Sequence, residues 1–209
     1  MQKIFPVTIL LLISVGELAA QRSYWVSEFK TDLFSDAVGF SVAPEMRFDG
    51  DGSRREQLCE IGLEYELPGS IDLGIGYRIG REWDSHDEAQ AFDRFSVDLK
   101  YGDSLGLLGY SFRLKYTNGD DPDDDQVRQY LRYRIKLDSK RDFYGITPYL
   151  GYELYQNLDD GCHERNALFG GLEWDFAHGN EISLEYKQVE KLHSKKDYDV
   201  ITIAYQFKF

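Results

Sequence analysis

The chain has 209 residues, of which 29% are charged, and its formal net charge is −13. This length suits one domain, and the acidic balance argues against nucleic-acid binding because phosphates would be repelled. Beyond the first twenty residues, no run approaches the roughly 18 apolar residues that a membrane-spanning helix needs, so a hydropathy scan alone would indicate a soluble protein.

Residues 1–20 have the parts of a secretory signal peptide. Lys3 supplies a positive charge, Ile9–Ile13 form an apolar run, and the small residues Ala19 and Ala20 precede Gln21. The export machinery and signal peptidase require this order. We therefore predict cleavage after residue 20, and a single mature domain over residues 21–209.

The mature chain alternates between apolar and polar residues from its start. In Ser23–Phe34, the residues Trp25, Phe29 and Leu33 share one face, and charged residues occupy the other. The alternation is clearest in Cys59–Leu67, where Cys, Ile, Leu and Tyr alternate with Glu and Gly. This period of two predicts β-strands that are apolar on one face.

Further segments with the same alternation follow to the C-terminus, at 71–80, 94–101, 108–116, 131–137, 150–155, 168–176, 182–187 and 201–209. Such strands are typical of a membrane β-barrel, in which lipid contacts the apolar face and the lumen is polar. A soluble sandwich also alternates. Two features favour the barrel: the aromatic content of 15%, with Tyr near the ends of the apolar faces, and closely spaced charges of both signs on the opposite face.

Strand count and loop length predict the architecture. Ten strands are expected from Val38 onward, and Ser23–Phe34 adds an eleventh, which would place the N-terminus outside the cell. We therefore expect an all-β, transmembrane antiparallel β-barrel of 10–12 strands with short periplasmic turns and longer polar outer loops. The expected short turns are Pro68–Gly69, Gly102–Asp103 and His178–Gly179; the expected outer loops are Ser85–Ala89, Asn118–Asp125, Asp159–Glu164 and Leu192–Lys196.

The last strand carries aromatic residues on its apolar face. Tyr205, Phe207 and the terminal Phe209 are in register with Ile201 and Ile203. This pattern resembles the C-terminal signal by which the barrel-assembly machinery recognises outer-membrane proteins. It predicts insertion into the bacterial outer membrane. We also expect contact with the lipid and lipopolysaccharide of that membrane, and a monomeric barrel.

The polar faces carry charges that are unevenly distributed between strands. We predict a basic wall in the lumen, formed by Arg94, Lys100, Arg113, Lys115, Arg128, Arg132, Arg134 and Lys136, and an acidic patch formed by Glu60, Glu64, Glu66 and Asp72. A basic wall in a water-filled pore would favour anionic solutes. The alternative is that opposite charges meet as ion pairs and plug a narrow structural or surface-interaction barrel.

No residue set indicates an enzyme, a cofactor or a metal centre. The histidines His86, His163, His178 and His193 fall in predicted loops and turns; a hydrolase site at the outer rim near His86 remains the less favoured alternative. The acidic run Asp120–Asp125 lacks the spacing of a calcium loop. Whether Cys59 and Cys162 form a disulfide is left open.

Four segments resemble a family of bacterial outer-membrane barrels known only as a domain of unknown function: Leu58–Asp84, Tyr130–Leu137, Thr147–Leu158 and Tyr205–Phe209. The resemblance covers nearly the whole mature chain and implies the fold and location. It implies no catalytic or binding residues. The chain is more distantly similar to the small oligogalacturonate-specific porins, in size and in its inward basic residues.

Overall fold

The computed structural model describes residues 21–33, 37–83, 88–121, 126–141, 144–176, 179–192 and 197–209. The predicted signal peptide, residues 1–20, lies outside this part of the chain. Within the described residues, no helix has the length and apolar character needed to cross a membrane.

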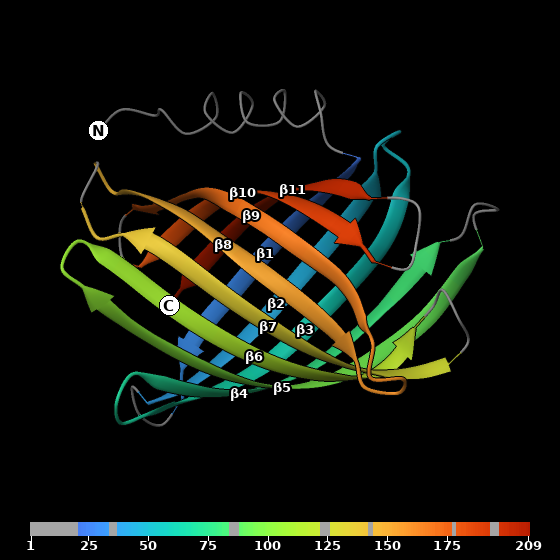
Figure 1. Cartoon of the computed structure of the whole chain (residues 1–209), viewed down its shortest axis with the longest axis horizontal. Coiled ribbons are helices and arrows are strands. Elements are labelled where there is room, and N and C mark those ends of the chain that lie inside the picture. Colours follow the sequence, from blue (N-terminus) through green and yellow to red (C-terminus); the bar gives the residue numbers. More distant parts are fainter. Residues whose placement is uncertain are drawn as a thin grey trace.

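The described residues form eleven strands that close into one barrel (Figure 1). The all-β barrel is therefore confirmed, and its strand count falls within the predicted ten to twelve. The strands are β1 (Arg22–Asp32), β2 (Val38–Asp49), β3 (Arg54–Leu67), β4 (Ile71–Trp83), β5 (Ala89–Leu105), β6 (Leu108–Asp121), β7 (Gln126–Ser139), β8 (Ile146–Asn157), β9 (His163–Phe176), β10 (Asn180–Lys191) and β11 (Tyr198–Lys208).

The barrel closes through a parallel pair. Consecutive strands are antiparallel, but β1 pairs with β11 in parallel, with Trp25 opposite Ile203. An odd number of alternating strands forces this arrangement, because the first and last strands then run in the same direction. The barrel is antiparallel as predicted at every pair of consecutive strands, and this closing pair is the exception among the described strands. The start of β1 consequently lies at the opposite end of the barrel from the C-terminus (Figure 1).

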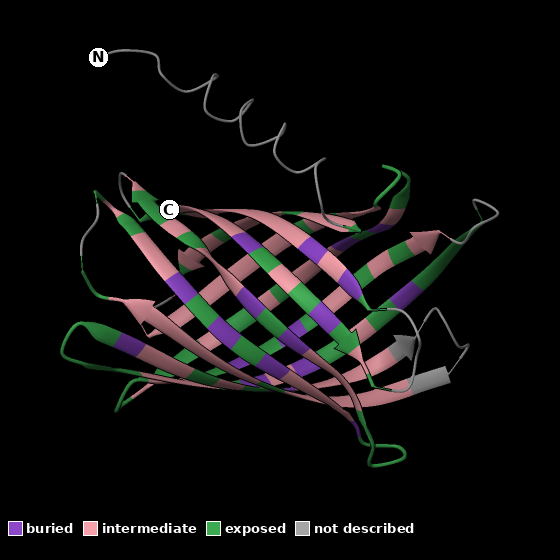
Figure 2. Ribbon diagram, turned by 45° about the horizontal axis from the view of Figure 1, so that its top comes forward, coloured by how far each residue is buried: buried purple, intermediate pink, exposed green. Residues whose placement is uncertain are grey.

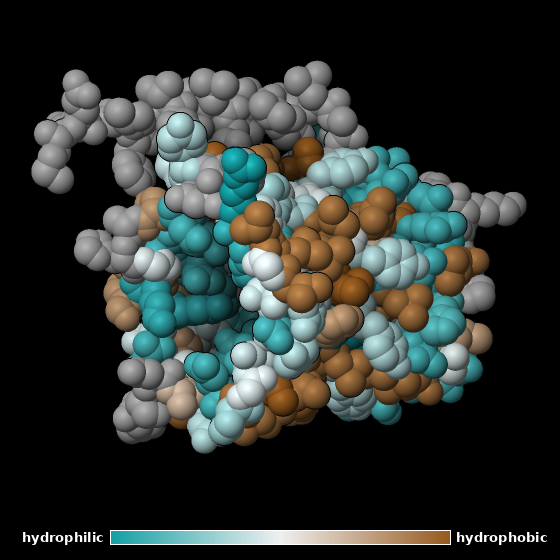
Figure 3. All heavy atoms as spheres, turned by 60° about the vertical axis from the view of Figure 1, so that its left-hand side comes forward, coloured by the Kyte–Doolittle hydropathy of each residue, from teal (hydrophilic) through white to brown (hydrophobic). Residues whose placement is uncertain are grey.

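The pleat separates an apolar outer wall from a polar lumen. Leu63 on the outer wall is 41% exposed, whereas Leu58, on the inner face of the same strand, is 4% exposed. Exposure alternates along the other strands in the same way (Figure 2). Figure 3 shows apolar residues covering much of the outer wall, beside a hollow lined by hydrophilic residues. The predicted inner and outer faces follow from this period of two.

The strand connections lie at two ends of the barrel. We call one the turn end: its connections are 33–37, 68–70, 106–107, 140–145 and 177–179, and the C-terminus lies there as well. The other, the loop end, carries the connections 50–53, 84–88, 122–125, 158–162 and 192–197, so connections of five or six residues occur at both ends. In Figure 1 the turn end is at the left and the loop end at the right.

Two predicted connections are misplaced. The turn expected at Gly102–Asp103 lies instead at Gly106–Leu107, because Gly102 pairs with Ser111 in the ladder and Gly106 adopts the left-handed conformation (φ 64°) that a two-residue turn needs. The expected loop Asn118–Asp125 is shorter than predicted, because the ladder between β6 and β7 continues to Asp121.

The C-terminal aromatic residues pack on the outer wall at the turn end. The Phe207 and Phe209 ring centroids are 4.5 Å apart, and those of Tyr205 and Phe207 are 6.1 Å apart. Phe207 also lies 6.5 Å from Phe29 of β1, so the cluster extends across the parallel closure. Strand β11 therefore contributes packing as well as backbone hydrogen bonds where the barrel closes.

Candidate functional site

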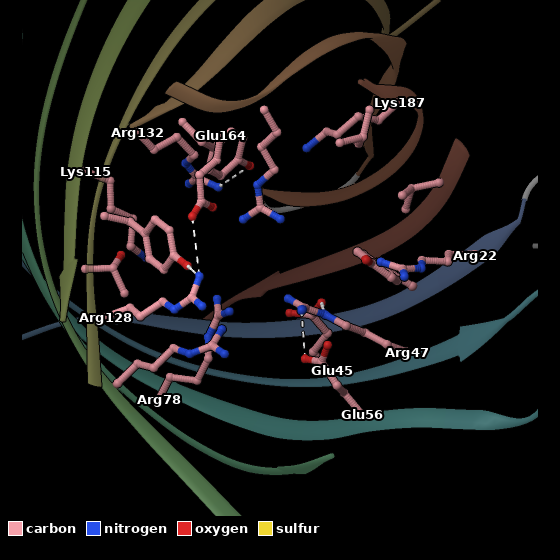
Figure 4. Close-up of a pocket in the computed structure, with 18 of the residues that line it drawn as sticks. Arg22, Glu45, Arg47, Glu56, Arg78, Lys115, Arg128, Arg132, Glu164 and Lys187 are labelled. Atoms are coloured by element: carbon pink, nitrogen blue, oxygen red, sulfur yellow. Dashed lines mark hydrogen bonds and ion pairs between the residues drawn. The ribbon is translucent and has the colours of Figure 1, made fainter. Parts of the chain in front are cut away.

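The inward faces enclose a cavity of about 890 Å³ in the half of the lumen nearest the loop end (Figure 4). Its basic lining residues are Arg22, Arg47, Arg55, Arg78, Arg94, Lys115, Arg128, Arg132, Arg165, Lys187 and Lys191; its acidic ones are Glu45, Glu56, Glu60, Glu82, Asp160, Glu164 and Glu185. Eleven basic and seven acidic residues leave four excess positive charges, in a chain whose overall charge is −13.

Several of these guanidinium groups stack on tyrosine rings. Arg22 lies 4.0 Å from the centroid of Tyr198, and Arg165 lies 4.1 Å from that of Tyr155. Such stacking holds a cation in place while leaving its in-plane N–H donors able to bind other groups. The wall of the cavity is therefore built from oriented cations and the polar edges of aromatic rings.

Most of the predicted basic wall is paired with carboxylates. Lys115 binds Glu60 at 3.1 Å, and Arg113 binds Asp98 at 3.0 Å through a bidentate contact. The other contacts are Lys100 with Glu64, Arg128 with Glu164 at 3.5 Å, Arg134 with Glu153 and Glu185, and Lys136 with Glu173. Two of these pairs, Lys100–Glu64 and Lys115–Glu60, join the predicted basic wall to the predicted acidic patch.

The remaining predicted residues lie around this network. Arg94 stacks over Phe92 at 4.8 Å. Glu66 and Asp72 face each other in the ladder between β3 and β4, close to the turn end. Arg132 lies in the cavity wall, and no carboxylate of the described chain is within ion-pairing distance of it.

A compact charged cluster lies at the base of the cavity. Glu153 is fully buried; it accepts a hydrogen bond of 2.7 Å from the Tyr155 hydroxyl and one of 3.2 Å from Lys187. Arg134 approaches Glu153 at 3.4 Å and donates to Glu185 at 3.0 Å. We call Glu153, Glu185, Arg134 and Lys187 the central cluster. Its members come from β7, β8 and β10, so it spans part of the lumen's width.

Several cavity residues were not among the predicted site residues: Arg22, Arg47, Arg55, Arg78, Arg165, Lys187 and Lys191. Most come from strands outside the predicted basic wall. On those strands the basic residues occur singly, so the sequence pattern alone does not indicate that they contribute to a charged site. Alternation places Arg165 and Lys187 on inner faces, but only the register shows that they meet the predicted residues.

The described residues contain no group of three or more His, Cys, Asp and Glu side chains that could hold a metal ion. His163 is exposed at the start of β9. His86, His178, His193 and the segment 122–125 of the acidic run lie outside the described residues. Cys59 and Cys162 are both free thiols.

Residues 22–198 match the model of a family described as "Protein of unknown function (DUF2490)". The chain belongs to the DUF2490 family. This match confirms the resemblance to a domain of unknown function that the strand segments indicated. No curated protein matches the DUF2490 chain in sequence.

Solved structures similar to this DUF2490 barrel are outer-membrane proteins. The β domain of the Bordetella autotransporter BrkA is 10% identical with a TM-score of 0.50, and the alignment covers 81% of this chain and 82% of that one. OmpT of Vibrio cholerae, expressed in the outer membrane, is 15% identical with a TM-score of 0.42, covering 75% and 52%. At this identity the BrkA match shows the fold alone: a closed barrel that resembles outer-membrane barrels.

Proposed function

We propose that the mature protein begins at residue 21 and spans the bacterial outer membrane, with its turn end in the periplasm and its loop end outside. The apolar outer wall supports a lipid environment. Twelve residues, the length of β8, span about 30 Å at the usual rise and tilt of barrel strands, which matches a bilayer core. The C-terminal aromatic cluster is the proposed insertion signal.

We further infer that the barrel is a small channel for anionic solutes. The observation that carries this proposal is the net positive lining of the cavity in a strongly acidic chain. We call this cavity the vestibule of the proposed channel. A narrow vestibule with low-dielectric walls and excess positive charge concentrates anions and repels cations. Arg132 and Arg165 lie two strands apart, about 10 Å between backbones, which is close to one Debye length at physiological salt, so their potentials add.

A plugged structural barrel is the second candidate, and the central cluster is the observation that favours it. Glu153 is 0% exposed, and ion pairs connect strands that are not neighbours. In strand number, this eleven-stranded barrel is intermediate between eight-stranded barrels, which side chains fill, and sixteen-stranded porins, which have open channels. Figure 3 shows a hollow lined by hydrophilic residues at the turn end. Together with the cavity near the loop end, this hollow favours the channel.

Swelling of proteoliposomes tests the channel. Vesicles containing the refolded protein are placed in isotonic solutions of an anionic, a neutral or a cationic solute of equal size. We expect the anionic solute to enter fastest. Equal rates for the three solutes, or fastest entry of the cation, would contradict the proposal. An absence of swelling in any solute, with a folded barrel, would support the plugged alternative.

The variant Arg132→Gln/Arg165→Gln shows whether the vestibule causes the preference. No carboxylate of the described chain lies within direct ion-pairing distance of either arginine, so removing both charges breaks no direct salt bridge, although Arg132 also reaches Glu153 through the Tyr155 hydroxyl. The matched control is Arg81→Gln, because Arg81 is exposed on the outside of β4. The double variant halves the excess positive charge of the lining, from four to two, so it is expected to lose about half of the preference for the anion, and the control to keep it.

A further inference from the structure

A row of cations crosses the inner wall along the ladder hydrogen bonds. Lys115 of β6 lies opposite Arg132 of β7, Arg132 lies opposite Tyr155 of β8, and Tyr155 lies opposite Arg165 of β9. Arg165 in turn lies opposite Lys191 of β10, close to the loop end. Because barrel strands tilt by about 35–45°, this row runs obliquely from the outer rim towards the middle of the lumen.

Three of these cations make no direct salt bridge within the described residues, although Arg132 reaches buried Glu153 through the Tyr155 hydroxyl. Lys115 binds Glu60, but no carboxylate of the described chain lies within ion-pairing distance of Arg132, Arg165 or Lys191. The Nε atoms of both arginines are buried and have no hydrogen-bond acceptor among the described residues. Charges in a partly buried wall are costly to leave unpaired, so an anion that binds them would be stabilised.

Tyr155 holds the two arginines on either side of it. The guanidinium of Arg165 lies 4.1 Å from its ring centroid, and Arg132 donates a 3.5 Å hydrogen bond to its hydroxyl. The hydroxyl itself donates to buried Glu153 at 2.7 Å, which fixes the ring. The two guanidinium groups are therefore oriented before any ligand arrives, which lowers the entropic cost of binding.

We propose that this row binds an extended solute carrying two or more carboxylates, an inference that rests on the proposed passage of anions. Strands lie about 4.8 Å apart, so the backbones of Arg132 and Arg165 are about 10 Å apart and Lys191 is one strand further. A single small anion cannot reach all three. Arginine side chains bind carboxylates through two parallel hydrogen bonds, and the cavity of about 890 Å³ accommodates a ligand of several hundred daltons.

Equilibrium binding to the refolded full-length protein in detergent, measured by calorimetry at low salt, tests this site. The probe is tri-glutamate with blocked ends, and tri-glutamine is its neutral counterpart. We expect tri-glutamate to bind and tri-glutamine not to bind. The Arg132→Gln/Arg165→Gln variant should bind tri-glutamate about tenfold more weakly or worse, whereas the Arg81→Gln control should be unchanged. Equal binding to the double variant and the wild type would overturn the site.

Two further comparisons separate the remaining outcomes. Inorganic pyrophosphate carries a charge close to that of tri-glutamate near neutral pH but has no carboxylate, so tighter binding of pyrophosphate than of tri-glutamate would overturn the carboxylate assignment. Tyr155→Phe keeps the ring but removes the hydroxyl contacts, and it should weaken tri-glutamate binding less than the double variant does. Unheated gel mobility checks that each variant folds.

Binding at equilibrium requires no current and no transport. Binding without any swelling or conductance would therefore overturn the proposed channel and leave this site standing. Transport of anions without binding of tri-glutamate would overturn the site and leave the channel standing.

Discussion

Replacing Glu153 with Gln tests the central cluster. The carboxylate is fully buried and touches Tyr155, Lys187 and Arg134 at 2.7, 3.2 and 3.4 Å. Loss of one member of a buried ion pair costs about 3–5 kcal/mol. Arg134 and Lys187 keep Glu185 as a partner, and the new amide oxygen still accepts from Tyr155, so we expect the lower end, about 3 kcal/mol.

The free energy of unfolding is measured by guanidinium titration of protein refolded into phospholipid vesicles, followed by tryptophan fluorescence. The matched control is Glu190→Gln, which removes the same charge from an exposed position of β10 and should change stability by no more than about 0.5 kcal/mol. Adding Lys187→Met to Glu153→Gln should recover about 1 kcal/mol, because it removes a buried cation that has lost one of its two carboxylate partners and keeps only Glu185. A loss below about 1 kcal/mol for Glu153→Gln would refute the reasoning, since it would mean that lumen water replaces the carboxylate.

Two other predictions concern assembly and orientation. Deleting Phe209, whose ring packs on Phe207, should lower the amount of barrel inserted into the outer membrane without preventing export. Membrane fractionation and unheated gel mobility measure the inserted barrel. Normal insertion would show that the terminal aromatic residue is not the insertion signal. In intact cells, a membrane-impermeant maleimide should label Cys162, which is exposed at the loop end, and Cys162→Ser should abolish that labelling because Cys59 lies on the outer wall of β3. Labelling only after the outer membrane is opened would reverse the proposed orientation.

The sequence was sufficient to predict the fold and the inner and outer faces of the strands. A period of two assigns each residue to a face, so Leu63 lies outside and Glu64 inside as expected. The closure through β1 could not be predicted, because alternation counts strands but does not show which edge the first strand joins. Turn positions also failed where a glycine that could form a turn, Gly102, lies in the ladder instead.

The site depends on information that one sequence does not contain. The row of Arg132, Tyr155 and Arg165 exists because three strands pair in one register, and a slip of two residues in β8 would keep every face and destroy the row. The pairing of Arg134 with Glu185 joins strands that are not neighbours, so it depends on barrel diameter and side-chain reach. The charge pattern of the sequence predicted the inward basic residues, but it did not predict which carboxylates they would pair with.

The most direct test of the proposed function is the reversal potential of the wild-type protein in a planar bilayer under a KCl gradient. The excess positive charge of the vestibule predicts a reversal potential shifted towards the equilibrium potential of chloride. It also predicts that the shift shrinks as salt is raised, because the cations of the vestibule are then screened. A reversal potential shifted towards the equilibrium potential of potassium would contradict the account.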